Sequence, residues 1–323
     1  LTYSPSTLAA PGSAGATCSP TARRRVAAAP AAETRRVLGN GVLAATTAPG
    51  AVAAGDENTT RKETTMHYIV SLSGGVASAV AADRAIVRYG REHVTLWIAD
   101  TSWEDPDLWR FVGDCMARWG GDLVRYCDGR TPLQVAEDRS IIPNQKIAPC
   151  SFELKIKPFR AYIETLPKPL TVILGLDWRE QHRMAAPVKN YGTIDGVSVD
   201  YPLLWKPIEY RPYQEVVRAW GIEPPRLYAL GAPHNNCGLR CVKQGVREWQ
   251  RLRFHFPERF AEVRDWEQAQ RAKGGPRATY AICRDSTGGD VKPLTLAETE
   301  QRDAPAEDGG ESQEDMFACM CSY

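Results

Sequence analysis

The sequence predicts an α/β fold with a doubly wound, mainly parallel sheet and a helical, cysteine-bearing C-terminal part. The first observation is that short apolar segments alternate along the chain with segments of helical periodicity. The second is that Leu170 to Leu176 is an uninterrupted apolar run, which is typical of a strand at the centre of a parallel sheet. The third is that the run from Tyr68 to Val70 is followed by a small-residue turn and a helix-forming segment. Strands that alternate with helices favour a doubly wound sheet.

The composition is that of an ordinary soluble protein. The chain has 323 residues, of which 43% are hydrophobic and 24% charged, so one large or two smaller domains are expected. A net charge of +1 gives no global argument for binding to nucleic acid or membranes. No apolar run approaches the roughly 18 to 20 residues of a membrane span. The nine cysteines are odd in number and partly clustered, which favours a reducing, cytoplasmic location over a disulfide scaffold.

The first 65 residues differ from the rest of the chain. They are rich in Ala, Thr, Pro, Gly and Ser, and they contain no Trp or Phe. Such a segment cannot bury enough apolar surface to offset the entropy lost on ordering. We therefore expect residues 1–65 to be a disordered or non-native extension, with a transit peptide as the alternative. Met66 precedes a strong strand and resembles a natural start.

The expected elements follow in chain order from Tyr68. A helix is expected from Val76 to about Tyr89, because Ala and Val continue there with helical spacing. Pro132 suits the first turn of another helix. The other expected elements are strands at His93 to Ala99, Asp122 to Tyr126 and Leu170 to Leu176, and helices at Asp107 to Trp119 and Thr131 to Asp138.

The segment from Ser71 to Ser78, called the glycine turn below, joins the first strand to the first helix. A strand, a glycine turn and a helix together point backbone N–H groups and the positive end of a helix dipole at an anion. The glycines allow positive φ and close approach of a phosphate. An ordinary βα turn is the alternative interpretation. The turn residues with these roles are Ser71, Ser73, Gly74, Gly75 and Ser78.

Polar or small residues also follow two other predicted strands. Asp100 and Thr101 end the second strand, and Gly175 and Asp177 lie at the end of the apolar run. Ligands of doubly wound sheets bind outside the carboxyl ends of the strands. This convergence favours a phosphate site over an ordinary turn.

Several cysteines have the character of ligands or reactive thiols. Cys237 and Cys241 are four residues apart, which on a helix would place both thiols on one face. Cys150 follows a proline at a predicted helix start, where a thiolate is favoured. Cys319 and Cys321 form a terminal C-x-C pair. Thiolates suit zinc or an iron–sulfur cluster, while redox-active thiols and unrelated reduced cysteines are the alternatives.

The chain changes character beyond Cys241. Residues 246–266 have helical periodicity, interrupted at Pro257, and they combine Trp and Phe with arginines. Such a surface could stack on nucleic acid, but a helical subdomain packed on the sheet is the favoured interpretation. Residues 298–315 are acidic and polar, which is typical of a flexible linker. The arginines concerned are Arg247, Arg251, Arg253, Arg259 and Arg264.

An ordered series of segments from residue 66 to about 245 resembles a known family. The segments read SLSGGVAS at 71–78, ADTSWEDPDLWRFV at 99–112, PCSFELKIKPF at 149–159, GLDWREQHRM at 175–184, YPLLWKPIEYRPYQEVV at 201–217 and PRLYALGAPHNNCGLRC at 225–241. In this order they resemble the phosphoadenylyl-sulfate (PAPS) reductase family, within the adenine nucleotide α-hydrolase-like, PP-loop ATP pyrophosphatase superfamily. The resemblance implies a PP-loop domain over residues 66–245. The residue patterns described above predict a helical region over 246–297 and an acidic flexible tail over 298–323 that ends in the C-x-C pair.

The resemblance also implies an adenine nucleotide, ATP or PAPS, at the carboxyl edge of the sheet. The glycine turn would hold phosphate or sulfate oxygens, and Asp100, Thr101 and Gly175 would lie beside the nucleotide. Lys155 and Lys157 would bind phosphate as point charges, and Arg179 and Arg183 as planar forks. The alternative for each basic residue is a solvated face. For Glu180 the alternative is an ion pair with a neighbouring arginine.

Two departures from the family pattern affect the reaction. ATP-cleaving members carry an aspartate in SGGxDS, and Ala77 stands at that place. The change weakens the argument for Mg²⁺ at the glycine turn, although Asp100 could still hold the ion. PAPS reductases end with an ECG-type segment whose cysteine attacks sulfur, and that segment is absent from this sequence.

The leading functional hypothesis is an enzyme that acts at the α-phosphate or sulfate of the nucleotide, by adenylation or sulfur transfer from a sulfur donor. Lys155, Cys237 and Cys241 are its expected catalytic residues. Family relatives that carry clusters favour [4Fe-4S] over Zn²⁺, with Cys150, Cys237, Cys241 and either Cys319 or Cys321 as ligands. One alternative is a PAPS reductase that releases sulfite with a thioredoxin-like reductant, in which Cys237, Cys241, Cys319 or Cys321 is the nucleophile. Another is a non-catalytic nucleotide-binding module in nucleic-acid modification.

Overall fold

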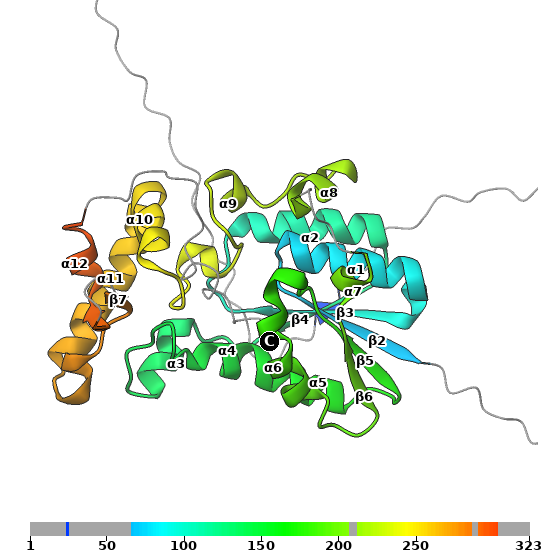
Figure 1. Cartoon of the computed structure of the whole chain (residues 1–323), viewed down its shortest axis with the longest axis horizontal. Helices are drawn as coiled ribbons and strands as arrows, with labels where there is room; N and C mark the ends of the chain where they lie inside the picture. Colours follow the sequence, from blue (N-terminus) through cyan, green and yellow to red (C-terminus); the bar gives the residue numbers. More distant parts are fainter. Residues whose placement is uncertain (1–23, 26–65, 207–211, 286–289, 303–323) are drawn as a thin grey trace, which may run out of the picture.

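The structure is a computed structural model that describes residues 24–25, 66–206, 212–285 and 290–302. Its centre is a six-stranded sheet in the order β1-β4-β3-β2-β5-β6 (Figure 1). Five strands run parallel: β2 (His67–Leu72), β3 (Val94–Asp100), β4 (Leu123–Cys127), β5 (Leu170–Ile173) and β6 (Val197–Asp200). The sixth strand, β1 (Arg24–Arg25), pairs antiparallel with β4 at the edge. The predicted doubly wound α/β fold is confirmed.

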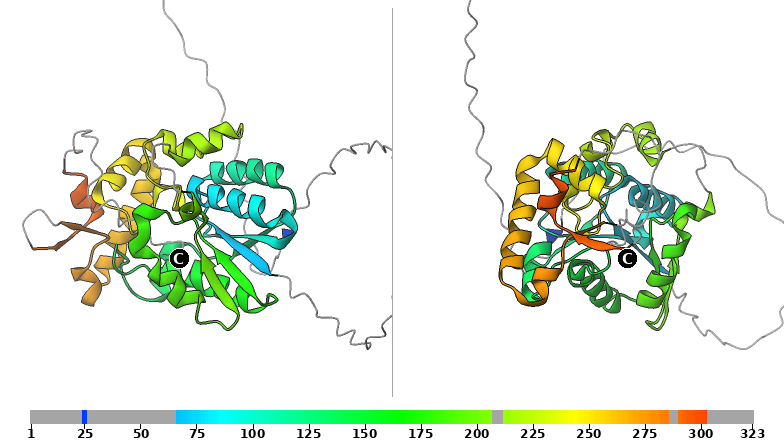
Figure 2. Two further views of the ribbon diagram at one scale, coloured as in Figure 1. Left: turned by 45° about the vertical axis from the view of Figure 1, so that its right-hand side comes forward. Right: turned by 60° about the vertical axis from the view of Figure 1, so that its left-hand side comes forward.

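Alternate residues of the strands pack into two separate cores. Val70 and Leu96 face a core that includes α1 (Val76–Tyr89) and α2 (Pro106–Trp119). Their neighbours Ile69 and Trp97 face a second core that includes α5 (Lys157–Glu164) and α6 (Ala185–Tyr191). This period of two places helices on both faces of the sheet, as Figure 2 shows. The strands are therefore buried on both faces, which explains their nearly continuous apolar sequence.

The first helices begin and end at residues that the sequence marks. The α2 helix starts after Asp105, whose side chain accepts a 3.0 Å hydrogen bond from the backbone nitrogen of Asp107. The α3 helix (Pro132–Asp138) starts after Thr131, which forms a capping box with Gln134. Both helices have proline in their first turn, where the missing N–H costs nothing. The predicted boundaries of these helices are correct to within one residue.

Several short elements connect the strands and the longer helices. A helical segment runs through α4 (Pro149–Ser151), the π-helical turn η2 (Phe152–Ile156) and α5. The predicted strand at 170–176 is shorter than expected, because β5 pairs only as far as Ile173. The remaining elements are η1 (Arg91–His93), η3 (Trp178–Arg183), α7 (Pro202–Trp205), α8 (Tyr213–Ala219), α9 (Arg226–Ala229) and η4 (Cys237–Leu239).

The C-terminal part packs around a third apolar core beside one end of the sheet, to which Trp103, Leu133 and Ile142 also contribute (Figures 1 and 2). Its long helices are α10 (Val246–His255) and α11 (Pro257–Ala272), so the interruption predicted at Pro257 is confirmed. A hairpin of β7 (Cys283–Asp285) and β8 (Lys292–Leu294) was not predicted, and it follows the turn η5 (Gly275–Thr279). The α12 helix (Leu296–Thr299) spans the predicted boundary at residue 297. Most of the predicted acidic tail lies outside the described residues, as does most of segment 1–65.

Within the described ranges, none of the helices is long and apolar enough to cross a membrane.

Candidate functional site

The candidate site lies where the direction of the chain across the sheet reverses. From β2 the chain proceeds to β3 and β4 on one side, and β5 and β6 lie on the other. The loops after β2 and β5 therefore meet at the switch point, where α/β sheets bind their ligands. A Cβ atom placed on Gly175, just after β5, would lie 2.7 Å from the Cα of Ser78. Gly175 thus allows the two loops to touch at backbone distance.

The glycine turn is held mainly by its own serines. Gly74 has a positive φ of 77°, as expected, whereas Gly75 has an extended φ of −97° and caps α1. The Ser78 hydroxyl donates to the carbonyl oxygen of Gly75 at 2.9 Å and accepts from the backbone nitrogen of Ser73 at 3.1 Å. The Ser73 hydroxyl lies 3.0 Å from the same Ser78 oxygen. These contacts fix the backbone that begins α1.

One of the two predicted phosphate-binding lysines lies beside the glycine turn. Lys155 lines a small cavity of about 10 Å³ together with Ser71 and Ser73. It belongs to the π-helical turn η2, and such turns recur at functional sites. Lys157 instead lies 3.3 Å from a carboxylate oxygen of Glu153 and is 64% exposed. The structure therefore places Lys155 at the site and Lys157 on the surface.

Asp100 and Thr101 end β3 near the glycine turn, but Asp100 already has a cationic partner. The Arg125 guanidinium donates to Asp100 through Nε, at 3.1 Å, and through Nη2. The same guanidinium lies 3.7 Å from the centroid of the Trp109 ring. Asp100 also accepts from the backbone nitrogen of Ser102 at 2.8 Å. These contacts compensate the negative charge of Asp100, the carboxylate that the sequence predicted as a possible Mg²⁺ ligand.

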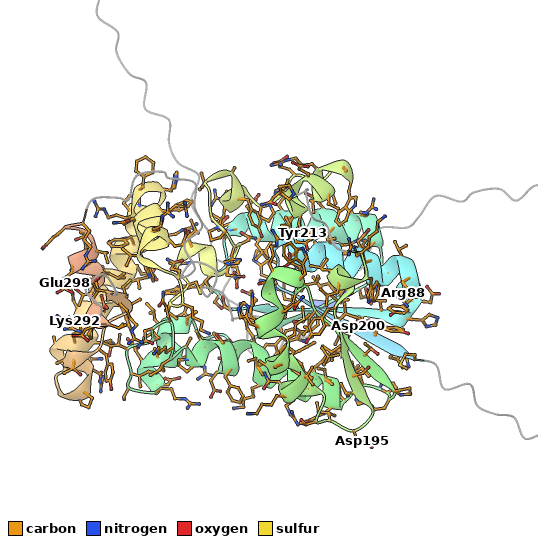
Figure 3. All side chains as sticks on the ribbon, viewed as in Figure 1. Arg88, Asp195, Asp200, Tyr213, Lys292 and Glu298 are labelled. Carbon is orange, nitrogen blue, oxygen red and sulfur yellow. The ribbon has the colours of Figure 1, made fainter. Side chains whose placement is uncertain are left out.

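Arg179 and Arg183, the two arginines predicted to bind phosphate, are both paired with carboxylates of the protein. Arg179 donates to Asp177 from its backbone nitrogen at 2.9 Å and from Nε at 3.0 Å. The Tyr213 hydroxyl, labelled in Figure 3, donates to Asp177 at 3.0 Å, and burial together with this carboxylate raises the pKa of Tyr213. Arg183 is buried and pairs with Glu180, which is the ion pair that the sequence offered as an alternative for Glu180. Neither arginine lines the cavity beside Lys155.

The cysteines do not lie as the helical spacing predicted. Cys237, Gly238 and Leu239 have consecutive positive φ values of 50°, 58° and 65°, so no α-helix runs from Cys237 to Cys241 and the one-face arrangement that a helix would give does not apply. The backbone nitrogen of Cys237 instead donates to Glu104 at 2.8 Å, and this hydrogen bond fixes the backbone at the start of η4. Cys241 is buried in the same C-terminal core.

Only three of the five cysteines predicted as metal ligands lie within the residues that the structure describes. Cys150 lies at the start of α4 as predicted, but it is buried in a separate small core with Leu154 and Val242. In the ranges that the structure covers, no three His, Cys, Asp or Glu residues are arranged to hold a metal ion. Cys319 and Cys321 lie outside these ranges. The four-cysteine site therefore stays a prediction.

Sequence reasoning missed Glu104, which connects three of the predicted site residues. Its Oε1 atom accepts from the Thr101 hydroxyl at 2.8 Å, and its Oε2 atom accepts from Cys237 as described above. Burial raises the pKa of Glu104, while the positive charge of Lys155 opposes that shift. The sequence signal that could have identified Glu104 is its position four residues after Asp100, the aspartate that ends the strand.

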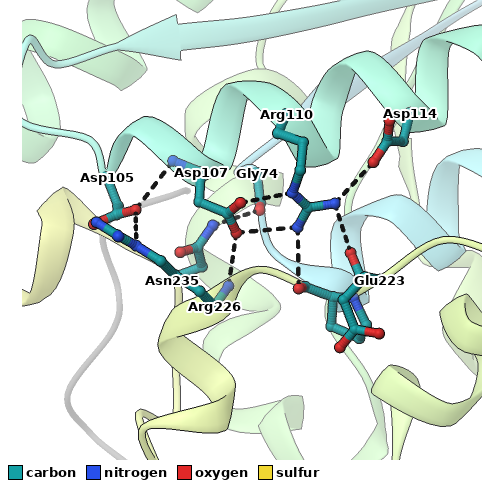
Figure 4. Close-up of polar contacts among 9 residues, drawn as sticks. Gly74, Asp105, Asp107, Arg110, Asp114, Glu223, Arg226 and Asn235 are labelled. Carbon is teal, nitrogen blue, oxygen red and sulfur yellow. Dashed lines mark hydrogen bonds and ion pairs between the residues drawn. The ribbon is translucent and has the colours of Figure 1, made fainter. Parts of the chain in front are cut away.

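A polar network attaches α9 and the loop after it to the start of α2 and to the glycine turn (Figure 4). The fully buried carboxylate of Asp105 accepts from Arg226 through Nε and Nη2, both at 2.8 Å, and from Arg259 Nη1 at 2.9 Å. Asn235 donates to the carbonyl oxygen of Gly74 at 2.9 Å. Other arginines of α10 and α11 also pair with acidic residues, for example Arg251 with Glu248. These pairings support the helical-subdomain interpretation of the arginine-rich segment.

Comparison with known proteins returns little sequence similarity. No family model matches the chain, and no curated protein matches it. Among solved structures, the chain is similar to the crystal structure of phosphoadenylyl-sulfate (PAPS) reductase from Candida auris in its phosphate complex. The two sequences are 18% identical over 54% of this chain and 81% of that chain, and the TM-score is 0.36.

Proposed function

We propose that this chain is an enzyme that binds an adenine nucleotide, ATP or PAPS, with a phosphate or sulfate group at the glycine turn. The observation that carries the proposal is the position of Lys155, which lines one cavity with Ser71 and Ser73 at the switch point of the sheet. A cation beside the turn from which α1 begins favours an anion there, because an ammonium group and a helix N-terminus both attract negative charge. The adenine nucleotide and the enzymatic role come from the resemblance of the ordered segments.

The chemistry that these groups support is electrostatic. The α1 N-terminus and the Lys155 ammonium would stabilise negative charge that develops on the group being transferred. The reaction is adenylation or sulfur transfer at the α-phosphate or the sulfate. Mg²⁺ fits the described residues poorly, because Ala77 offers no ligand and Asp100 is held by Arg125. No step is therefore assigned to a protein-bound metal ion.

Thiol-dependent reduction of PAPS is the second candidate, because Glu104 holds the backbone of Cys237 beside Thr101. In this reaction the Cys237 thiolate attacks the sulfur of PAPS, a bond between the two sulfur atoms forms, and the bond from sulfur to the phosphate oxygen breaks. Adenosine bisphosphate leaves with the electron pair. A thiol reductant of the thioredoxin class then attacks Cys237 and releases sulfite.

Calorimetric titration of the full chain with ATP and with PAPS tests the binding proposal. Lys155→Ala should weaken binding by about tenfold to a hundredfold, because hydrogen bonds to charged groups contribute about 1.5–3 kcal/mol. Lys157→Ala is the matched control, and it should bind within about twofold of the wild type because Lys157 pairs with Glu153 on the surface. Equal affinity of the Lys155→Ala variant and the wild type would contradict the proposal.

Product analysis separates the candidate reactions. Release of pyrophosphate from ATP and Mg²⁺ supports adenylation, and release of sulfite from PAPS with a thiol donor supports reduction. Tight binding without either product supports a non-catalytic module. Iron, sulfide and zinc analysis after anaerobic purification tests the predicted cysteine site, and a fully active protein without metal would contradict it.

A further inference from the structure

We propose that Tyr228 is a lock on the glycine turn, whose hydroxyl occupies the position of a phosphate oxygen until the nucleotide displaces it. The proposal rests on the proposed function and concerns the regulation of the same site. Tyr228 lies on α9, and its hydroxyl oxygen accepts a 3.3 Å hydrogen bond from the backbone nitrogen of Val76. A Cβ atom placed on Gly75 would lie 2.9 Å from that oxygen.

The contact uses a group that a nucleotide would also use. Val76 is the first residue of α1, so its N–H has no partner within the helix. Such an N–H is suited to an anion, and Gly75 leaves the approach to it clear of a side chain. In this structure the oxygen that makes the approach belongs to Tyr228. A phosphate oxygen and the tyrosine hydroxyl therefore compete for the same donor.

The helix that carries Tyr228 is anchored independently of that contact. The Arg226 guanidinium holds Asp105 through two hydrogen bonds of 2.8 Å, and the backbone nitrogen of Arg226 donates to Asp107 at 2.7 Å (Figure 4). The backbone of α9 is thus fixed to the start of α2. Val76 can therefore be released by rotation of the half-buried Tyr228 side chain while the backbone of α9 stays in place.

The effect of this competition on nucleotide affinity can be predicted. A hydrogen bond to a charged phosphate is stronger than one to a neutral hydroxyl, so the nucleotide displaces Tyr228 rather than the reverse. The apparent affinity is still reduced by the fraction of molecules in which the lock is open. A contact with the strength of an ordinary neutral hydrogen bond leaves about one molecule in six open, so its removal should tighten binding about sixfold.

Calorimetry and stopped-flow binding with ATP and with inorganic pyrophosphate test the lock in the full chain. Tyr228→Phe keeps the ring and removes the hydroxyl, and it should bind both probes about sixfold tighter, mainly through faster association. Tyr280→Phe, on the exposed surface of the C-terminal part, is the matched control and should leave affinity unchanged. Weaker binding by Tyr228→Phe would make the hydroxyl a phosphate ligand, and unchanged binding would show no competition. Either result overturns the lock.

A second measurement separates failure of the lock from failure of the proposed function. Amide hydrogen exchange of Val76, followed by NMR without nucleotide, should be faster in Tyr228→Phe than in the wild type because the N–H loses its acceptor. An unchanged exchange rate would overturn the lock alone. If neither protein binds ATP, PAPS or pyrophosphate, the proposed function fails and the lock with it. Equal thermal midpoints would show that both proteins remain folded.

Discussion

Asn235 donates a 2.9 Å hydrogen bond from its Nδ2 atom to the carbonyl oxygen of Gly74, across 161 residues of sequence. Asn235 is almost fully buried, and Gly74 has the positive φ that begins the glycine turn. The orientation of this peptide group sets the path of the chain into α1. The segment that carries Cys237 therefore supports the shape of the glycine turn directly.

Removal of this link should destabilise the fold. Asn235→Ala leaves the carbonyl oxygen of Gly74 without its buried donor, and we expect a loss of about 1–2 kcal/mol in the free energy of unfolding. Urea denaturation followed by tryptophan fluorescence measures the change. Gln181→Ala, at an exposed position of η3, is the control and should stay within about 0.5 kcal/mol of the wild type. A midpoint for Asn235→Ala equal to that of the control would mean that the link does not support the turn.

Replacement of two glycines by alanine should change the free energy of unfolding in opposite directions, because Gly175 lies in close contact with α1 and Gly113 has open space around it. Gly175→Ala places a Cβ atom 2.7–2.8 Å from backbone atoms of Ser78, which cannot move aside, and should cost about 1–3 kcal/mol. Gly113→Ala lies on the exposed side of α2 with no heavy atom within 4 Å of the new Cβ. It should stabilise the protein by about 0.5–1 kcal/mol, because alanine is the better helix former. Thermal unfolding of the two variants should move in opposite directions, and a stabilised Gly175→Ala would refute the close approach.

Asp105 should contribute acid-sensitive stability. Burial alone would raise the pKa of its carboxyl, but hydrogen bonds from Arg226, the backbone of Asp107 and Arg259 hold the pKa below its ordinary value. A carboxyl with a lowered pKa stabilises the folded state above its unfolded pKa of about 4, and that stability is lost as pH falls through the lower folded pKa. Asp105→Asn should therefore cost about 2–4 kcal/mol at pH 7 and progressively less below about pH 4.

Urea unfolding between pH 7 and pH 3 measures this difference. Asp114→Asn is the matched control, because Asp114 pairs with Arg110 while its side chain is 46% exposed. We expect a cost of about 0–1 kcal/mol for the control at every pH. A pH-independent difference between Asp105→Asn and the wild type would assign the effect to packing rather than to charge.

The sequence predicted the parts of the site whose conformation is set locally. The strand before Ser71 and the helix from Val76 follow from residue periodicity and the glycines between them, and the structure has both. The conformation of Cys237 could not be predicted, because Glu104 fixes it from 133 residues away. The position of Tyr228 over Val76 depends likewise on contacts across 152 residues. Spacing alone describes a continuous helix, and such tertiary contacts override it.

Lys155 and Lys157 also show that the sequence alone cannot assign a role to each residue, even for two residues that are close in the chain. Lys155 and Lys157 belong to one sequence segment and look equally suited to a phosphate. The π-helical turn η2 ends between them, so only Lys155 lines the cavity beside the glycine turn. No local pattern marks where an extra residue enters a helical turn, so the sequence could not separate them.

Thiol labelling should separate the described cysteines by environment. Burial raises the pKa of Cys115 to about 12, and it also raises the pKa of Cys283. At pH 8 the Cys115 thiolate would be only about one part in ten thousand, and the thiolate is the form that reacts. Cys127 is only partly buried at the end of β4, so alkylating reagents can reach it. Iodoacetamide under native conditions should therefore modify Cys127 well before Cys115 or Cys283.

Peptide mass spectrometry over a labelling time course checks this order, with labelling in guanidinium as the control in which all three thiols should react at similar rates. Cys237 belongs in the same time course, because the thiol proposed to attack PAPS is itself buried and a nucleophile must be reached by its substrate. Cys115 that reacts as fast as Cys127 would show that α2 opens readily from the sheet, since Cys115 belongs to the core beneath that helix. Slow labelling of Cys115 instead shows that this thiol stays protected in the core beneath α2.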